Sequence, residues 1–263
     1  MPPATAPPRL EQRIVTIRGE TAGYLAGGAG EPLVFVHGLS GSTRWWARNA
    51  PHLARHYAVY VVNLPGFGQL SWRRSRFVLR EAADWLADWL AAVGIERCHL
   101  VGHSMGGFIA IGVATRHPTL VRSLALVAPA GVPTGRTFVG HGIPLIAAGL
   151  VAAPSFLPTL VFDALRAGPR TLLRAARDLL TEDVRSELRA ISQPTLLVWG
   201  DRDTLVPPSL APAMLSELPH GRLALVRGAG HVPMYDRPRA FNEALLNFLR
   251  GEDAERWDSE REV

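Results

Sequence analysis

The sequence predicts an α/β fold, in which a mostly parallel eight-stranded sheet has helices on both faces and a helical cap insertion lies over the carboxyl ends of the strands. Two observations predict it. Short apolar runs of strand length alternate with longer segments of helical periodicity along most of the 263 residues. Between residues 129 and 193 these runs stop, and the pattern becomes helical, apolar and interrupted by proline. We therefore expect one sheet-based core that carries a cap.

The strands are expected in two groups. Residues 14–18 and 24–26 are expected to pair as an antiparallel hairpin at the edge of the sheet. The helix expected at residues 80–93 has its large apolar side chains at helical spacing, which predicts a face packed on the core rather than an aromatic binding site. Parallel strands are expected at residues 33–36, 58–62, 98–101, 123–127, 195–199 and 223–226.

These elements divide the chain into a core of residues 14–128 and 194–250 and a cap of residues 129–193. Residues 1–13 are rich in proline and alanine and have no apolar segment after a basic start, so we expect a disordered leader without a secretion signal. Residues 251–263 are expected to form a flexible tail. Because the cap follows the sixth strand, we expect it over the carboxyl ends of the sheet, where it shapes a substrate pocket.

The cap has two apolar features, and each has two interpretations. Residues 142–153 are rich in aliphatic side chains but too short and too interrupted to cross a bilayer, so they either pack on the core or form a lipophilic wall for an acyl chain. A later helix has leucines on one face and Arg170, Arg174 and Arg177 elsewhere. Such an amphipathic helix suits a lid, and equally an ordinary docked helix.

A Gly-x-Ser-x-Gly motif, from Gly102 to Gly106, indicates a nucleophile at Ser104. The apolar run before it and the helical pattern of residues 105–117 after it are the setting in which this motif lifts a hydroxyl out of the sheet. The turn needs glycines because strand and helix approach each other closely. A serine hydroxyl is a poor nucleophile at neutral pH, so the motif predicts a histidine base and an orienting carboxylate later in the chain.

Both partners follow later strands. The seventh expected strand leads into a turn that contains Asp201 and Asp203, and the eighth leads through a glycine-rich loop to His231. The order Ser, Asp, His, with each residue past the carboxyl end of a strand, predicts Ser104, Asp203 and His231 as a catalytic triad. Asp201 competes with Asp203 because it lies in the same turn. Asp236 is a third candidate, which fits better as the N-cap of the last helix.

An ester-cleaving serine also needs two backbone N–H donors for the negative oxygen of the transition state. Met105 supplies one, because it directly follows the nucleophile. The other is expected from the loop after the strand at residues 33–36, where Leu39 is the best candidate. Gly38 gives this loop the freedom to turn its amide toward the substrate, and His37 is expected to brace the loop rather than to react.

These motifs are similar to those of the α/β-hydrolase superfamily, in its branch of small esterases, lipases and cofactor-free haloperoxidases. The resemblance covers nearly the whole chain and implies the α/β-hydrolase fold. A serine in the elbow argues against the dehalogenase and epoxide hydrolase relatives, which use aspartate there. His103 stands where the carbon–carbon hydrolases usually have asparagine, which counts against that activity. Asn63 heads the Pro-Gly-Phe-Gly turn where relatives usually carry aspartate, so that turn lacks a structural charge.

Composition limits the classes of partner. The chain has 28 basic residues, all arginine, and a net charge of +5, but they are scattered among 23 acidic residues. The one dense cluster, residues 72–76, is expected to be a solvated loop, so we expect no nucleic-acid partner and no stable membrane insertion. The lack of lysine leads to the hypothesis of a GC-rich, thermophilic source. The single cysteine, Cys98, is expected to fill the core and fits a cytoplasmic location.

The predicted function is a serine hydrolase that cleaves carboxylic esters with small to medium, lipophilic acyl chains through an acyl-enzyme. Its partner is thus a small-molecule ester, and no oligomeric state is predicted. Three alternatives use the same scaffold: a cofactor-free perhydrolase or haloperoxidase, a carbon–carbon hydrolase and a noncatalytic ligand receptor. The histidines lack metal-ligand spacing and no phosphate-binding motif is present, so neither a metal nor a cofactor is expected.

Overall fold

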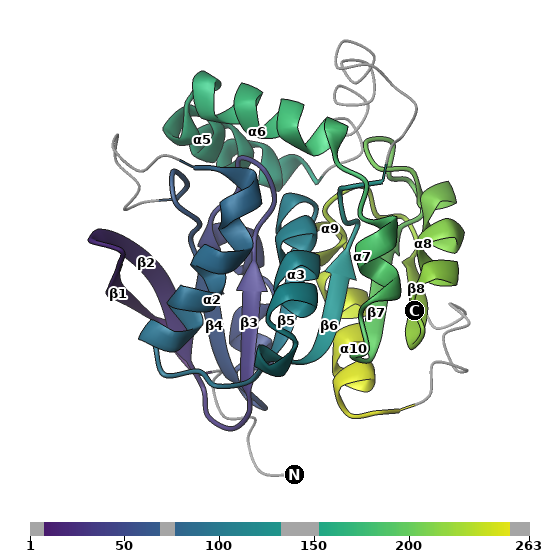
Figure 1. Cartoon of the computed structure of the whole chain (residues 1–263), viewed down its shortest axis with the longest axis horizontal. Coiled ribbons are helices and arrows are strands. Elements are labelled where there is room, and N and C mark those ends of the chain that lie inside the picture. Colours follow the sequence, from purple (N-terminus) through teal and green to yellow (C-terminus); the bar gives the residue numbers. More distant parts are fainter. Residues whose placement is uncertain (1–7, 69–76, 133–152, 253–263) are drawn as a thin grey trace.

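The computed structural model describes residues 8–68, 77–132 and 153–252, and these form an α/β sandwich around one eight-stranded sheet (Figure 1). The spatial order of the strands is β1-β2-β4-β3-β5-β6-β7-β8. The strands are β1 (Glu11–Ile17), β2 (Glu20–Gly27), β3 (Pro32–Val36), β4 (Ala58–Val62), β5 (Cys98–His103), β6 (Val121–Val127), β7 (Thr195–Gly200) and β8 (Gly221–Val226).

Strand direction confirms the predicted fold class. Strands β1 and β2 form an antiparallel hairpin at one edge, β2 is also antiparallel to β4, and the remaining neighbours are parallel. The expected disordered leader was too long, because its last residues, Glu11 to Arg13, pair with β2 as part of the hairpin. These residues have no apolar alternation, so their pairing comes from backbone hydrogen bonding to β2 rather than from burial of side chains.

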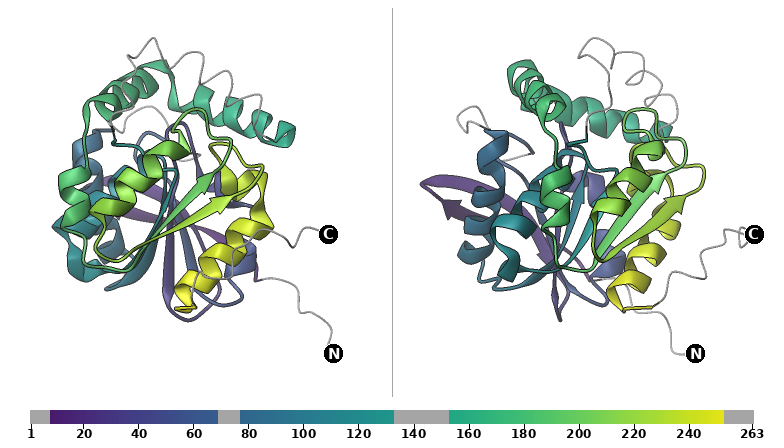
Figure 2. Two further views of the ribbon diagram at one scale, coloured as in Figure 1. Left: turned by 90° about the vertical axis from the view of Figure 1, so that its right-hand side faces the viewer. Right: turned by 45° about the vertical axis from the view of Figure 1, so that its right-hand side comes forward.

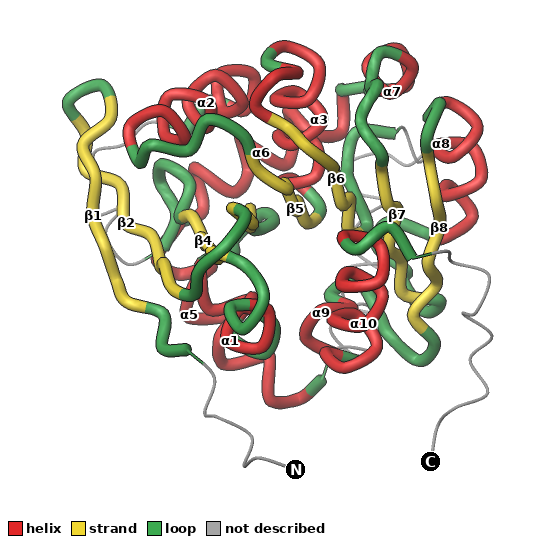
Figure 3. Tube along the Cα trace, turned by 90° about the horizontal axis from the view of Figure 1, so that it is seen from below, coloured by secondary structure: helices red, strands yellow, loops and turns green. Residues whose placement is uncertain are grey.

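Helices cover both faces of the sheet and create two hydrophobic cores, one on each side (Figure 3). One face packs against α2, α3, α7 and α8, and the other against α1, α9 and α10. The predicted core face of α2 is confirmed, because Trp85, Leu86, Trp89 and Leu90 are all buried. The helices are α1 (Ala50–Leu53), α2 (Ala82–Ala92), α3 (Met105–Arg116), α7 (Arg185–Arg189), α8 (Ala211–Glu217), α9 (Pro233–Asp236) and α10 (Pro238–Leu249), with 3-10 turns η1 (Thr43–Trp46), η2 (Leu79–Glu81), η3 (Pro118–Leu120), η5 (Pro154–Phe156) and η6 (Pro208–Leu210).

Two further helices, α5 (Leu157–Ala167) and α6 (Pro169–Thr181), form a layer beyond the carboxyl ends of the parallel strands (Figures 1 and 2). Gly168 joins them with φ of 76°, a left-handed conformation that favours glycine. They belong to the segment predicted as the cap. Of that segment, residues 133–152 lie outside the described residues, as does the basic cluster at 72–76. Within the described parts of the chain, no helix is long and apolar enough to span a membrane.

Candidate active site

Ser104 lies at the sharp turn between β5 and α3, as the Gly-x-Ser-x-Gly motif predicts. Its backbone has φ of 52° and ψ of −114°, an unfavourable conformation for a residue with a side chain. The neighbouring glycines make the turn sterically feasible. A Cβ atom on Gly102 would lie 2.3 Å from the carbonyl oxygen of Gly106, and one on Gly106 would lie 2.4 Å from that of Val36. Any larger residue at either position would force strand and helix apart.

Backbone hydrogen bonds fix this turn on both sides. The N–H of Ser104 donates to the carbonyl oxygen of Val127 at 2.9 Å, and its own carbonyl oxygen accepts from Ala130 N–H at 3.1 Å. Helix α3 begins at Met105, so the N–H of Met105 belongs to the first turn, whose donors have no acceptor within the helix. The structure thus places a helix N-terminus, which favours negative charge, beside the serine.

Asp203 and His231 lie together, as predicted from the order of motifs. Oδ2 of Asp203 accepts a hydrogen bond from Nδ1–H of His231 at 2.8 Å, which assigns the tautomer with Nε2 free to accept a proton. Oδ1 of the same buried carboxylate accepts from the N–H groups of Leu205 and Val206 at 2.9 and 3.0 Å. The hydrogen bonds among the described residues therefore connect the acid and the base of the proposed triad, and include none to the Ser104 hydroxyl.

Asp201 and Asp236, the two alternative candidates for the triad carboxylate, bind the backbone of the loop before His231 rather than its ring. Asp201 accepts from the N–H of Gly228 at 2.7 Å. Asp236 accepts from the N–H of Gly230 at 2.9 Å and from that of Ala153 at 3.1 Å. The expectation that Asp236 caps the last helix was wrong, because Asp236 ends α9 and Arg237 precedes α10. Its carboxylate lies near the N–H of Gly230 because the short helix α9 folds the chain back toward the loop that precedes it.

His37 braces the loop after β3, as expected. Its Nε2 accepts from the N–H of Leu64 at 3.2 Å, and its Nδ1–H donates to the carbonyl oxygen of Gly38 at 2.8 Å. Complete burial lowers the pKa of His37 to about 4, so the ring is neutral at neutral pH. A Cβ atom on Gly38 would lie 3.2 Å from that of Ser104, so this backbone passes directly beside the nucleophile. Leu39, the predicted second oxyanion donor, is the next residue.

His103 is a part of the site whose role sequence reasoning missed. It is fully buried, and its Nε2–H donates to the backbone carbonyl of His231 at 2.8 Å. The two imidazole rings have their centroids 4.9 Å apart. Burial, together with the neighbouring His231, holds the pKa of His103 well below its ordinary value, so it acts as a neutral donor. Because His103 directly precedes Ser104, it connects the nucleophile turn to the histidine loop.

A buried aspartate of the cap, Asp163 in α5, was also missed. Its Oδ2 accepts from Ser42 Oγ–H at 2.7 Å and from Trp45 Nε1–H at 3.2 Å, and its Oδ1 lies 3.9 Å from a guanidinium nitrogen of Arg44. All three partners belong to the segment that follows the proposed oxyanion loop. Burial raises the pKa of Asp163 despite these partners. A helix prediction gives no sign that an aspartate faces inward, so only the structure reveals this link.

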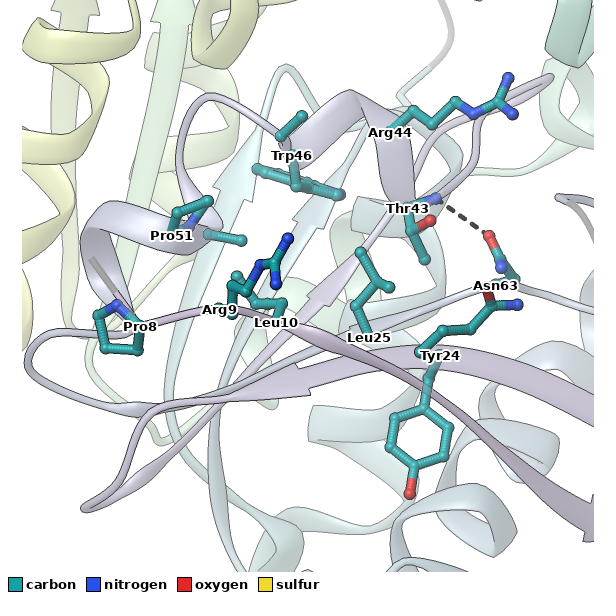
Figure 4. A pocket seen from close by; sticks show the side chains of 13 residues that line it. Pro8, Arg9, Leu10, Tyr24, Leu25, Thr43, Arg44, Trp46, Pro51 and Asn63 are labelled. Carbon is teal, nitrogen blue, oxygen red and sulfur yellow. Dashed lines mark hydrogen bonds between the residues drawn. The ribbon is translucent and has the colours of Figure 1, made fainter. Parts of the chain in front are cut away.

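None of Ser104, Asp203 and His231 lines the cavity in Figure 4. It has a volume of about 420 Å³ and lies between the β1–β2 hairpin and η1, with Arg9, Tyr24 and Trp46 among its walls. At its edge, Oδ1 of Asn63 accepts from the N–H of Thr43 at 3.0 Å. Asn63 thus ties its turn to η1 as a neutral acceptor.

Comparison with known proteins places the chain in a family. The model of an alpha/beta hydrolase family matches residues 33–244. The chain belongs to the alpha/beta hydrolase family. Among its relatives, it is 32% identical to a pimeloyl-[acyl-carrier protein] methyl ester esterase from Aeromonas hydrophila, over 84% of this chain and 96% of that protein. It is 33% identical to a putative carbamate hydrolase from Yersinia enterocolitica, over 84% of this chain and 88% of that protein.

Solved structures of hydrolases share the fold of this chain. A crystal structure of a membrane phospholipase A superposes with a TM-score of 0.81 at 30% sequence identity, over 92% of this chain and 86% of that one. This hydrolase thus has esterase-type relatives in both comparisons. Cys98 lies in its core, where burial raises the pKa of the thiol to about 12. Within the described ranges, no group of three or more His, Cys, Asp or Glu side chains is placed to hold a metal ion.

Proposed function

We propose that this hydrolase cleaves carboxylic esters through an acyl-enzyme on Ser104, with His231 as the general base and Asp203 as its orienting carboxylate. The hydrogen bond from His231 Nδ1 to Asp203 Oδ2, 2.8 Å long, is the observation that carries the proposal. A carboxylate on Nδ1 fixes the tautomer in which Nε2 can take a proton, and this is the state that a serine nucleophile requires. The strained turn at Ser104 supplies that nucleophile.

The reaction then has two steps. His231 Nε2 removes the proton of Ser104 Oγ as the oxygen attacks the ester carbonyl, and the tetrahedral oxyanion is held by the N–H groups of Met105 and Leu39. The proton passes from His231 to the departing alcohol as the bond from carbon to the leaving oxygen breaks. Water, deprotonated by His231, attacks the acyl-enzyme in the second step and releases the carboxylic acid and free Ser104.

We propose esters with small to medium, lipophilic acyl chains as substrates. The cap helices form a layer beyond the carboxyl ends of the strands (Figure 2), and Leu172 and Leu179 of α6 are partly buried and pack against the core from this layer. The printed names of relatives include an esterase for a methyl ester and a hydrolase for carbamates, and both describe attack by water on an acyl carbon. These names support acyl-bond hydrolysis, and the apolar cap favours the uncharged members of that class.

The test is the initial rate of hydrolysis of p-nitrophenyl esters of graded acyl length. Ser104→Ala is compared with Ser216→Ala, a matched control on the exposed surface of α8. We expect a rate maximum at short or medium chains that Ser104→Ala abolishes and Ser216→Ala leaves intact. If Ser104→Ala hydrolyses every ester as fast as the unaltered enzyme, the proposal fails. An assay with acetate, peroxide and halide then tests the perhydrolase alternative.

A further inference from the structure

Helix α5 has a carboxylate on its inner side and a row of apolar side chains on its outer side. Its buried side chains include Asp163, while Leu157, Val161 and Leu165 recur every four residues on the outer side. These three are 52%, 49% and 78% exposed, and Phe162 beside them is 40% exposed. A surface helix in water normally turns its aliphatic side chains inward and its carboxylate outward. The outer side of α5 is therefore built to contact something apolar.

The outer face of α5, defined by Leu157, Pro158, Val161, Phe162 and Leu165, is the main apolar surface of the described residues. Seven large hydrophobic side chains are exposed in those parts of the chain, and five of them belong to the two cap helices, with Leu173 of α6 as the fifth. Together with Pro154, the α5 residues line an open apolar groove. Contiguous exposed apolar surface of this kind marks an interaction site more often than isolated leucines do.

Arginine side chains lie beside this outer face, and the guanidinium carbon of Arg166 in α5 itself lies 5.5 Å from the centre of the Phe162 ring. The guanidinium carbon of Arg44 lies 4.3 Å from the centre of the Phe162 ring. On the neighbouring helix α6, Arg170, Arg174 and Arg177 are exposed at helical spacing. Asp163, whose buried carboxylate lies 3.9 Å from Arg44, is the one acidic residue of α5, and α6 has Asp178 against its three arginines. The two cap helices thus present an aliphatic face next to a net cationic helix.

The apolar face and the neighbouring arginines together distinguish between two partners for this surface, a second copy of the chain and a lipid bilayer. A second copy of the chain, docked face to face about a two-fold axis, would bring arginines into contact with the same arginines, which is unfavourable. In a bilayer with anionic headgroups, the leucines can contact the acyl chains while the guanidinium groups bind the phosphates at the surface. We propose that the outer face of α5, with the arginines beside it, docks this protein reversibly on anionic lipid surfaces.

Docking of this kind does not depend on ester hydrolysis. Helices α5 and α6 form the layer beyond the carboxyl ends of the strands, the side on which β5 ends and α3 begins (Figure 1). Contact through α5 therefore brings that side toward the lipid, where lipophilic esters accumulate. It requires no spanning helix, because side chains of an interfacial helix enter only the boundary between headgroups and acyl chains.

The test is sedimentation of the full chain with vesicles of phosphatidylcholine alone and of phosphatidylcholine with phosphatidylglycerol. Leu165→Glu places a charge at the most exposed position of the outer face, and Leu225→Glu makes the same change at another solvent-accessible leucine, on β8, 52% exposed. We expect binding to the anionic vesicles to fall about tenfold or more with Leu165→Glu and to stay unchanged with Leu225→Glu. Binding to phosphatidylcholine alone should be weaker, and added salt should reduce binding to the anionic vesicles.

Three outcomes would overturn the proposal. The first is that the unaltered protein does not sediment with anionic vesicles. The second is that Leu165→Glu binds as well as the unaltered protein, which would mean attraction by charge alone. The third is a dimer in sedimentation velocity that Leu165→Glu dissociates, without lipid binding, which would assign the face to a second copy. Hydrolysis of a soluble ester by Leu165→Glu is measured in parallel, so that loss of docking and loss of the active site are distinguished.

Discussion

Asp163 makes a sharp energetic test of the link between the cap and the core. Replacement by alanine removes the acceptor of two buried donors, Ser42 Oγ–H and Trp45 Nε1–H. Each donor left without an acceptor costs about 1–3 kcal/mol, so the two together cost roughly 2–6 kcal/mol. Loss of the carboxylate returns part of this, because burial disfavours its charged form. We expect Asp163→Ala to lower the free energy of unfolding by about 2 kcal/mol or more.

Asp163→Asn separates the hydrogen bonds from the charge. The amide oxygen can accept hydrogen bonds from both donors without the desolvation cost of a carboxylate. The ion pair with Arg44, 3.9 Å long, is lost, but its contribution is small because it is partly exposed. We expect Asp163→Asn to stay within about 1 kcal/mol of the unaltered protein at neutral pH. Urea unfolding followed by tryptophan fluorescence measures both variants, with Asp178→Asn on α6 as a control for loss of a cap carboxylate.

The pH dependence gives a second check on the same carboxylate. A folded-state pKa above the ordinary 3.8 means that the stabilising contribution of Asp163 is complete below that pH and is lost as pH rises through the folded pKa. The stability of Asp163→Asn relative to the unaltered protein should therefore improve from acidic to neutral pH. The reasoning is refuted if alanine costs nothing, or if asparagine costs as much as alanine at neutral pH.

Three further predictions concern the triad and its supports. Asp203→Asn should lower kcat on a soluble ester by about 10⁴, because the wrong imidazole tautomer is favoured, while Asp201→Asn, whose amide oxygen can still accept from Gly228, should retain most activity. Gly200→Ala should cost about 3 kcal/mol or more in urea unfolding, because its Cβ would lie 2.1 Å from the carbonyl oxygen of Gly230; a stable variant would contradict this contact. His37, with its pKa lowered from 6.5 to about 4, contributes about 3 kcal/mol that is present above pH 6.5 and lost as pH falls toward 4. His37→Gln should flatten this part of the unfolding profile, and an unchanged slope would assign it to other groups.

The sequence predicts the fold and the candidate residues where the signal is local. Apolar runs of strand length and the glycines around Ser104 act through neighbours in the chain, so their pattern can be recognised without coordinates. The hydrogen bond between Asp163 and Ser42 joins a helix to a loop that lies 121 residues away in the sequence. Helical spacing alone does not determine whether Asp163 lies on the inner or the outer side of α5. The role of Asp236 was misjudged for a related reason, because its N-cap pattern is local but its true partner is the N–H of Gly230.

The support of His231 explains why so many of the missed contacts end on one loop. This loop contains Gly228 with φ of 68°, and such a glycine-rich segment loses much conformational freedom when it is ordered. A general base must hold its imidazole within a few tenths of an ångström of a productive position, so the loop needs fixed contacts. Asp201 and Asp236 bind its N–H groups, His103 binds its carbonyl oxygen, and Asp203 binds the ring. Because these contacts come from three segments, the turn after β7, the end of β5 and α9, no single motif encodes the position of the base, and removal of any one should loosen it without abolishing the fold.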